Sequence, residues 1–151
     1  MKSPKTIFFV ASFVIFLSLV YFNYSKAQTA IRQTQPSPLS ISLVSIPERV
    51  KEGNSGSFIW SINASTDLNT SFTTIYWGYV STPSALTKTD SPLAVGYSNY
   101  IPDYTKGVFK LPGSFDLSLP FTKAGRVFFR AYAHVKNNHL WTEEKYIDII
   151  K

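Results

Sequence analysis

From residue 39 to the C-terminus, apolar and polar residues alternate with a period of two. Successive side chains of a β-strand point to opposite faces of a sheet, so this alternation predicts half-buried strands. The alternation predicts six strands, at residues 39–45, 57–64, 73–80, 114–119, 126–136 and 140–150. A seventh strand is expected between residues 93 and 111, and residues 48–56 are expected to form a turn region.

The longest of these segments, residues 126–136, shows the alternation most clearly. Its first face carries only apolar side chains: Val127, Phe129, Ala131, Ala133 and Val135. Its other face carries larger and more polar ones: Phe128, Arg130, Tyr132, His134 and Lys136. We expect the first face to pack in the core and the second to be a solvated surface, with Asn137 and Asn138 forming a hairpin turn.

Two other strands each carry a tryptophan. Phe58, Trp60 and Ile62 share one face of residues 57–64, which predicts a half-buried strand. Residues 73–80 are rather apolar on both faces, as is typical of a strand in the middle of its sheet. No segment of the domain keeps a sustained helical period. The sequence therefore predicts an all-β domain built as an antiparallel β-sandwich of about seven strands.

The N-terminus has a different pattern. An apolar run, residues 7–22, contains only two serines and follows Lys2 and Lys5, which is typical of an export signal. As a helix it would extend about 24 Å, which is short for a membrane span. Ser25 and Ala27 are small residues suited to cleavage before Gln28. Removal of a signal peptide and retention as a membrane anchor both remain open.

These patterns divide the chain into three parts: a signal peptide or signal anchor at 1–27, a polar linker at 28–38 and a β-sandwich domain at 39–151. In either case the domain is exported. We expect an extracytoplasmic protein, secreted or held by a single pass, with the membrane as a partner through residues 7–22 if they are uncleaved.

Charge and cysteine content exclude several classes. The net charge is +6, but three lysines lie before Gln28, so the domain carries twelve basic and nine acidic residues, a net charge of about +3. No run of basic residues is present, and nucleic acid is not an expected partner. The absence of cysteine excludes disulfides, thiolate nucleophiles and sulfur-ligated metals.

The last predicted hairpin resembles the fibronectin type III and immunoglobulin-like superfamily. Residues 124–133, A-G-R-V-F-F-R-A-Y-A, are similar to the start of strand F in such domains, commonly P-G-T-Y-Y-F-R-V-R-A. Residues 140–144, L-W-T-E-E, are similar to the P-W-S-E-P that opens strand G. By this resemblance, the strands with Trp60 and Trp77 correspond to strands B and C.

The chain departs from that family at two places. Val127 occupies the position of the usual corner tyrosine, and residues 81–113 form a longer connection than is typical. The resemblance implies a sandwich with a binding or spacing role, but a fold alone does not assign a function.

The long connection holds the main candidate site, Tyr97, Tyr100 and Tyr104 among small polar residues. Exposed tyrosines can stack on sugars or anchor a protein partner. The same side chains can instead fold the connection over a sheet edge, and this second interpretation is favoured. The basic row with Arg130, Tyr132 and His134 is a second candidate, for an acidic partner or a glycan.

His134 and His139 flank the predicted turn and could come together, with Glu143 or Glu144, as a thin metal site. Two histidines without a definite third ligand are more often ordinary surface residues, so neither a metal nor another cofactor is expected. No nucleophile motif or phosphate loop occurs, and we do not expect an enzyme. Asn63 and Asn69 match the acceptor pattern for N-glycosylation.

These observations favour a non-catalytic β-sandwich module that binds an unknown protein or the cell envelope. The alternative is a domain that binds a carbohydrate or small ligand through the loop from Tyr97 to Tyr104. A metal-binding role around His134 and His139 is the weakest hypothesis.

Overall fold

The structure is a computed structural model that describes Tyr21, residues 39–97 and residues 99–151. The expected N-terminal helix, the rest of the apolar run 7–22, the cleavage site before Gln28 and the linker 28–38 lie outside the described residues. Within the described part of the chain, no helix has the length and apolar character needed to cross a membrane.

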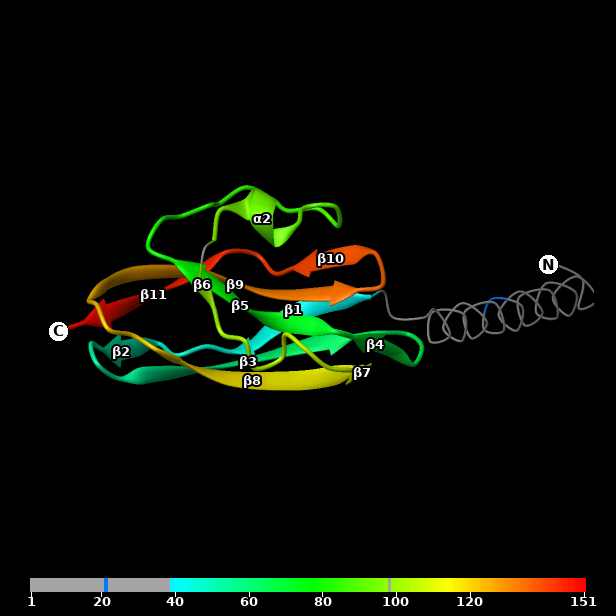
Figure 1. The fold of residues 1–151 in the computed structure, drawn as a ribbon, viewed down its shortest axis with the longest axis horizontal. Coiled ribbons are helices and arrows are strands. Elements are labelled where there is room, and N and C mark those ends of the chain that lie inside the picture. The colour runs from blue at the N-terminus through cyan, green and yellow to red at the C-terminus, as the bar shows by residue number, and fades with distance from the viewer. Residues whose placement is uncertain (1–20, 22–38, 98) are drawn as a thin grey trace, which may run out of the picture. The chain divides into compact units, whose positions relative to one another are not determined.

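The first sheet of the domain has three strands. Its order is β1 (Ser40–Ser45), β3 (Ser55–Asn63) and β8 (Gly113–Pro120), and both pairings are antiparallel. In Figure 1, β3 and β8 lie along the lower side of the domain. All three strands of the sheet match segments that the alternation predicts.

The second sheet is larger. Its order is β2 (Arg49–Lys51), β11 (Lys145–Ile150), β9 (Gly125–Val135), β5 (Phe72–Gly78) and β6 (Asn99–Tyr100), and β10 (Asn138–Trp141) also pairs with β9. The pairing of β11 with β2 is parallel and the others are antiparallel. A small third sheet joins β4 (Leu68–Thr70) to β7 (Phe109–Leu111). The all-β class is confirmed.

The core lies between the first two sheets, where the alternation predicts it. Phe58, Trp60 and Ile62 are fully buried on β3, and the apolar face of β9 is buried opposite them. The rings of Phe58 and Phe129 meet edge to face at 4.9 Å. Trp60 Nε1 donates a hydrogen bond of 2.8 Å to Oγ1 of Thr73 on β5, which links the two layers.

Three local predictions are wrong. Residues 140–150 form two strands, because Thr142 Oγ1 accepts a hydrogen bond from the Ala131 amide at 3.0 Å and interrupts the ladder. The expected turn region contains β2. The β9–β10 turn lies one residue early, with Lys136 at a φ of 55°, because Asn138 already pairs with Val135.

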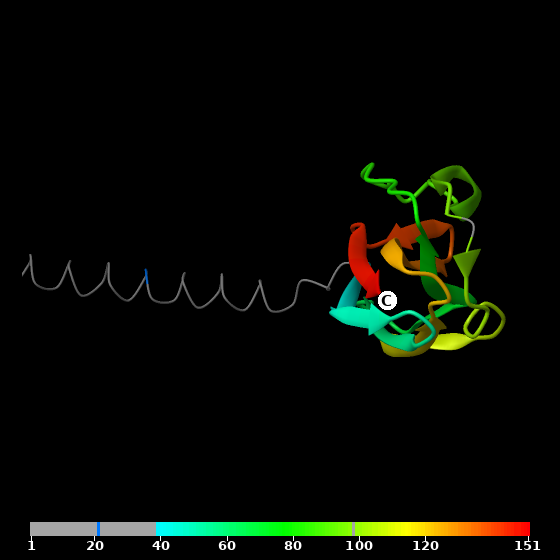
Figure 2. The same cartoon turned by 90° about the vertical axis from the view of Figure 1, so that its left-hand side faces the viewer.

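A third layer covers the outer face of the second sheet. Residues 79–97, here called the strap, cross this face and contain the short helix α2 (Pro92–Val95). Figures 1 and 2 both show α2 on the side of the second sheet that faces away from the first. The expected solvated row on β9 is therefore largely covered, with Arg130 and Tyr132 each 3% exposed. Phe128 and His134 are half-buried.

Candidate functional site

The strap is fixed to the sheet by Glu144, which lies in the break between β10 and β11. Its Oε1 accepts a hydrogen bond of 2.7 Å from the Thr82 amide and another from the hydroxyl of Tyr97, and Oε2 accepts one from Ser81. Burial opposes ionisation of this carboxyl, but the hydrogen bonds outweigh it and hold the pKa of Glu144 below its usual value.

Arg130 supports the same segment from below. Its Nη2 donates hydrogen bonds of 2.9 Å to the carbonyl oxygens of Thr82 and Ser84, and its Nη1 donates one of 3.0 Å to the carbonyl of Thr142. The expectation that Arg130 faces solvent is wrong, because the strap covers it. Burial leaves its guanidinium bound to backbone carbonyls, so it positions the strap.

The three tyrosines of the long connection have three different environments. Tyr97, the last residue of the strap, is 6% exposed, and burial followed by its hydrogen bond to Glu144 raises its pKa. Tyr104 packs its ring at 5.9 Å from that of Trp60, at the border of the core. Tyr100 alone is an exposed ring, at 46%. In the favoured interpretation these side chains pack the long connection against the sheets, and Tyr97 and Tyr104 are positioned in this way.

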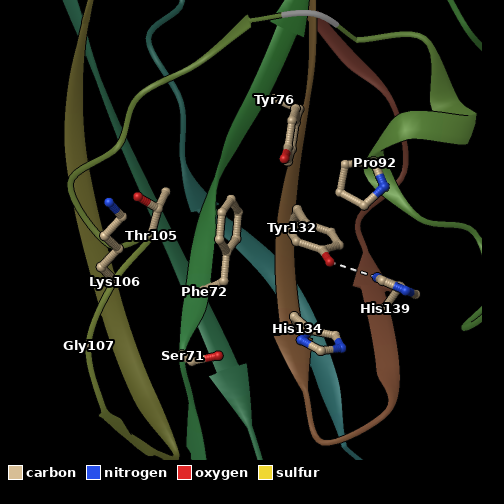
Figure 3. A pocket seen from close by; sticks show the side chains of 10 residues that line it. All are labelled: Ser71, Phe72, Tyr76, Pro92, Thr105, Lys106, Gly107, Tyr132, His134 and His139. Atoms are coloured by element: carbon tan, nitrogen blue, oxygen red, sulfur yellow. Dashed lines mark hydrogen bonds between the residues drawn. The ribbon is translucent and has the colours of Figure 1, made fainter.

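One hollow of the surface, here called the main hollow because it shares lining residues with two others, lies between the strap and the loop 102–108. It has a volume of about 360 Å³, and Figure 3 shows the residues that line it: Ser71, Phe72, Tyr76, Pro92, Thr105, Lys106, Gly107, Tyr132, His134 and His139. Strand β5 contributes Phe72 and Tyr76, β9 contributes Tyr132 and His134, and β10 contributes His139. The floor of the hollow is therefore the outer face of the second sheet.

The aromatic floor is held by ring contacts. Phe72 and Tyr76 stack with their centroids 6.5 Å apart, and Phe72 meets Tyr132 edge to face at 5.6 Å. Tyr100 continues the row, with its centroid 5.2 Å from that of Tyr76. Burial and the neighbouring Tyr100 raise the pKa of Tyr76 to about 12, so its hydroxyl stays neutral. The floor offers a rigid aromatic surface to a ligand.

The two histidines pair across strands β9 and β10. Their rings stack at 5.0 Å, and His139 Nδ1 lies 2.6 Å from the hydroxyl of Tyr132. Burial, followed by His134, lowers the pKa of His139, while burial raises that of Tyr132. The tautomer of the neutral imidazole sets the direction of this hydrogen bond: Nδ1 accepts from the tyrosine hydroxyl when Nε2 carries the proton, and donates to it when Nδ1 does.

The hypothetical metal site lacks its third ligand. Glu144, one of its two candidate carboxylates, is bound to the strap. In the part of the chain that the structure describes, no three His, Cys, Asp or Glu side chains are grouped to hold a metal ion.

Two further hollows adjoin the main one and share lining residues with it. A hollow of about 500 Å³ shares Tyr76 and Pro92 with it and is also lined by Ser91, Leu93, Gly96, Tyr97 and Tyr100. A hollow of about 230 Å³ shares Ser71, Gly107 and His134 with it and adds Asn69, Thr70, Val108 and Lys136. We call the three together the trough. Its shared lining residues make it an elongated site.

Both glycosylation acceptors are exposed. Asn63 ends β3, and Asn69 lies on β4 at one end of the trough. A glycan on Asn69 would stand beside Lys136, so modification there would affect access to the trough.

The sequence analysis missed Phe72 and Lys106 as site residues. The signal for Phe72 was present, because Phe72 and Tyr76 are an even number of positions apart and so share a face of one strand. No sequence pattern marked Lys106 as a site residue, because tertiary contacts position the loop 102–108. One of these contacts is the hydrogen bond of 2.9 Å from the Thr73 amide to the Tyr104 carbonyl.

Two solved structures share features of this fold. A PKD domain of an M14-like peptidase from a Thermoplasmatales archaeon is 14% identical, with a TM-score of 0.50 over 78% of this chain and 100% of that one. An AA10 lytic polysaccharide monooxygenase from Streptomyces lividans is 17% identical, with a TM-score of 0.39 over 78% of this chain and 62% of that one. No family model matches, and no curated protein matches.

The likeness to the PKD domain agrees with an immunoglobulin-like β-sandwich. At 14% identity it concerns the fold alone. The closer assignment to the fibronectin type III group stays a prediction.

Proposed function

We propose that this protein is an extracytoplasmic, non-catalytic module that binds a carbohydrate in the trough. The observation that carries the proposal is the main hollow of about 360 Å³, whose floor is the aromatic row of Phe72, Tyr76 and Tyr132. Ligand sites are commonly concave and largely apolar, with a few polar groups that fix orientation. Ser71, Thr105 and the two histidines supply such groups here.

The trough includes only part of the loop that the sequence offered as a carbohydrate site. The loop from Tyr97 to Tyr104 contributes Tyr97 and Tyr100 to one end of the trough, while Tyr104 packs against the core. Phe72, which is half-buried, and Tyr100 offer the accessible rings. Stacking on such rings suits a sugar because its apolar C–H face covers the ring while its hydroxyls reach polar groups at the rim.

The experiment is a binding screen of the domain against a panel of polysaccharides, followed by titration calorimetry on each binder. Phe72→Ala and Tyr100→Ala are expected to weaken binding at least tenfold, or about 1.4 kcal/mol. Tyr146→Ala is the matched control, because Tyr146 is a 54% exposed tyrosine on β11 and lines none of the three hollows. Binding to no polysaccharide of the panel, or equal losses in all three variants, would refute the proposal.

A protein partner is the second candidate. Leu93 on α2 is 98% exposed and lies in the hollow beside Tyr100. Exposed apolar side chains next to an aromatic ring are typical of contact surfaces between proteins. Leu93→Ser would then abolish capture of a membrane-fraction protein and leave polysaccharide binding unchanged.

The extracytoplasmic location is supported by the apolar run 7–22 that follows two lysines. N-terminal sequencing of the protein from its host tests how the domain is held. Gln28 as the first residue would show a cleaved signal, and an intact N-terminus would show a membrane anchor.

A further inference from the structure

Two lysines and two histidines line the trough. The lysines carry positive charge near pH 7, whereas burial lowers the pKa of His139 and favours its neutral form. Lys106 and His139 line the main hollow, Lys136 lines the hollow beside Asn69, and His134 lines both. Among the described residues that line the three hollows there is no aspartate or glutamate. Concave sites lined by one sign of charge concentrate ligands of the opposite sign.

From this juxtaposition we propose that the trough binds a linear acidic polysaccharide, one whose sugar rings carry carboxylates. This inference rests on the proposed function, since it names the class of carbohydrate that the trough takes. The aromatic floor binds the rings, and the two lysines pair with carboxylates along the chain.

The strap contains one carboxylate, that of Asp90, that acts electrostatically on His139 in the main hollow. The Asp90 carboxylate accepts hydrogen bonds of 2.6 Å from the Thr87 amide and 2.8 Å from the Thr87 hydroxyl, and these lower its pKa. Asp103 precedes Lys106 in the loop 102–108 but is not a lining residue. Among the residues that the structure describes, neither Lys106 nor Lys136 forms an ion pair.

The two lysines stand on separate segments of the chain and line different hollows of the trough. Lys106 lies on the loop 102–108, and Lys136 forms the turn between β9 and β10. Figure 3 shows Lys106 and His139 at opposite sides of the main hollow, with Phe72 and Tyr132 between them. Lys106 lines the main hollow and Lys136 lines the hollow beside Asn69, so a ligand that pairs with both must extend over two hollows. A chain with repeated carboxylates can contact the aromatic floor and both lysines together.

The carboxylates of an acidic peptide could pair with the lysines equally well. Such a peptide has no sugar ring to stack on the aromatic floor. The rings of Phe72 and Tyr100 lie 5.9 Å apart and both are accessible, so they offer successive stacking surfaces to neighbouring sugars. The observations thus favour the glycan, and the peptide becomes an outcome of the test.

The test compares ligands that differ only in charge. A polygalacturonate oligomer, an alginate oligomer and a glucuronate-containing oligomer are titrated into the domain, each beside its fully methyl-esterified form. At least one acid form is expected to bind at least about tenfold more tightly than its ester. That preference should fall between about 0.05 M and about 0.5 M salt, because salt screens exposed charges.

Lys106→Gln and Lys136→Gln are expected to weaken binding of the acid form about fivefold to tenfold each, and to leave the ester unaffected. Lys51→Gln is the control, because Lys51 is exposed on β2 and lines none of the three hollows. Circular dichroism shows that each variant keeps its fold. Lys106→Met, with an apolar chain of similar length, replaces any glutamine variant that does not.

The outcomes separate the two proposals. Equal binding of acid and ester would overturn the acidic class and leave the trough a carbohydrate site. Binding of neutral polysaccharides but of no acidic one would also overturn the acidic class and leave the trough a carbohydrate site. If polyglutamate bound as tightly as the best acidic glycan, charge alone would account for recognition and the polysaccharide would be the wrong class. If the native protein bound neither acidic nor neutral glycans, both the acidic class and the proposed function would be overturned.

Discussion

Arg130 Nη2 donates a hydrogen bond of 2.9 Å to the carbonyl oxygen of Thr82, a residue 48 positions earlier in the chain. This contact ties the strap to the centre of β9. Arg130→Met keeps an apolar stem of similar length but removes the donors to three carbonyls. We expect a loss of about 3 kcal/mol in the free energy of unfolding, measured by urea titration, because buried polar groups lose their partners.

Arg126→Met is the control for that measurement. Arg126 forms an ion pair of 2.8 Å with Asp148, but the two side chains are 50% and 46% exposed. Exposed pairs contribute less than about 1 kcal/mol. Similar losses in both variants would show that Arg130 is not a structural support of the strap.

Glu144 makes the strap sensitive to acid. Since its pKa is lower in the folded protein than in the unfolded chain, its contribution to stability is present above the unfolded value and is lost as pH falls through the folded one. Glu144→Gln should therefore be less stable than the native protein at pH 7. The gap between their urea midpoints should narrow below about pH 4, and a gap that does not change with pH would contradict this assignment.

Gly56 on β3 is required by close packing. A Cβ added there would lie 2.8 Å from Pro47 Cγ and 3.0 Å from Val50 Cγ2. We expect Gly56→Ala to cost about 2 kcal/mol in unfolding free energy, from overpacking. Gly78→Ala on β5 is the control, because the nearest atom to its new Cβ is 3.6 Å away, and its effect should stay within about 0.5 kcal/mol.

The sequence was sufficient for the core because alternation depends only on strand geometry. Val127, Phe129 and Ala131 are buried as predicted, and so are Phe58 and Trp60. Prediction was less exact where the ladder is irregular. The break between β10 and β11 depends on one hydroxyl, Thr142 Oγ1, replacing a backbone acceptor. The pattern of hydrophobic and polar residues does not show where a side-chain hydroxyl replaces a backbone acceptor.

The site could be predicted only in part. The outer row of β9 contains Arg130, Tyr132 and His134 at the expected positions. Whether solvent reaches that face depends on the strap, a segment far away in the chain. The strap reaches it through Glu144, a residue that the sequence offered only as a weak metal ligand. Long-range contacts of this kind carry no local signal, so a solvated row and a covered one have the same pattern.

His139 gives a second dependence on pH, in a different range. Burial, followed by the neighbouring His134, lowers the pKa of His139 in the folded protein below its ordinary value of about 6.5, and Asp90 opposes this. Below that value the unfolded chain binds more protons than the folded one, so stability should fall as pH decreases from about 7 to about 5. Urea midpoints measured across this range should show the fall.

His139→Gln tests the source of that fall, because it removes the titrating ring but keeps an oxygen that can accept the Tyr132 hydroxyl. The slope of stability against pH should be smaller in this variant. His134→Gln should reduce the slope by less, since it removes only the repulsion between the stacked rings and leaves His139 buried. An unchanged slope in His139→Gln would place the titrating group elsewhere in the domain.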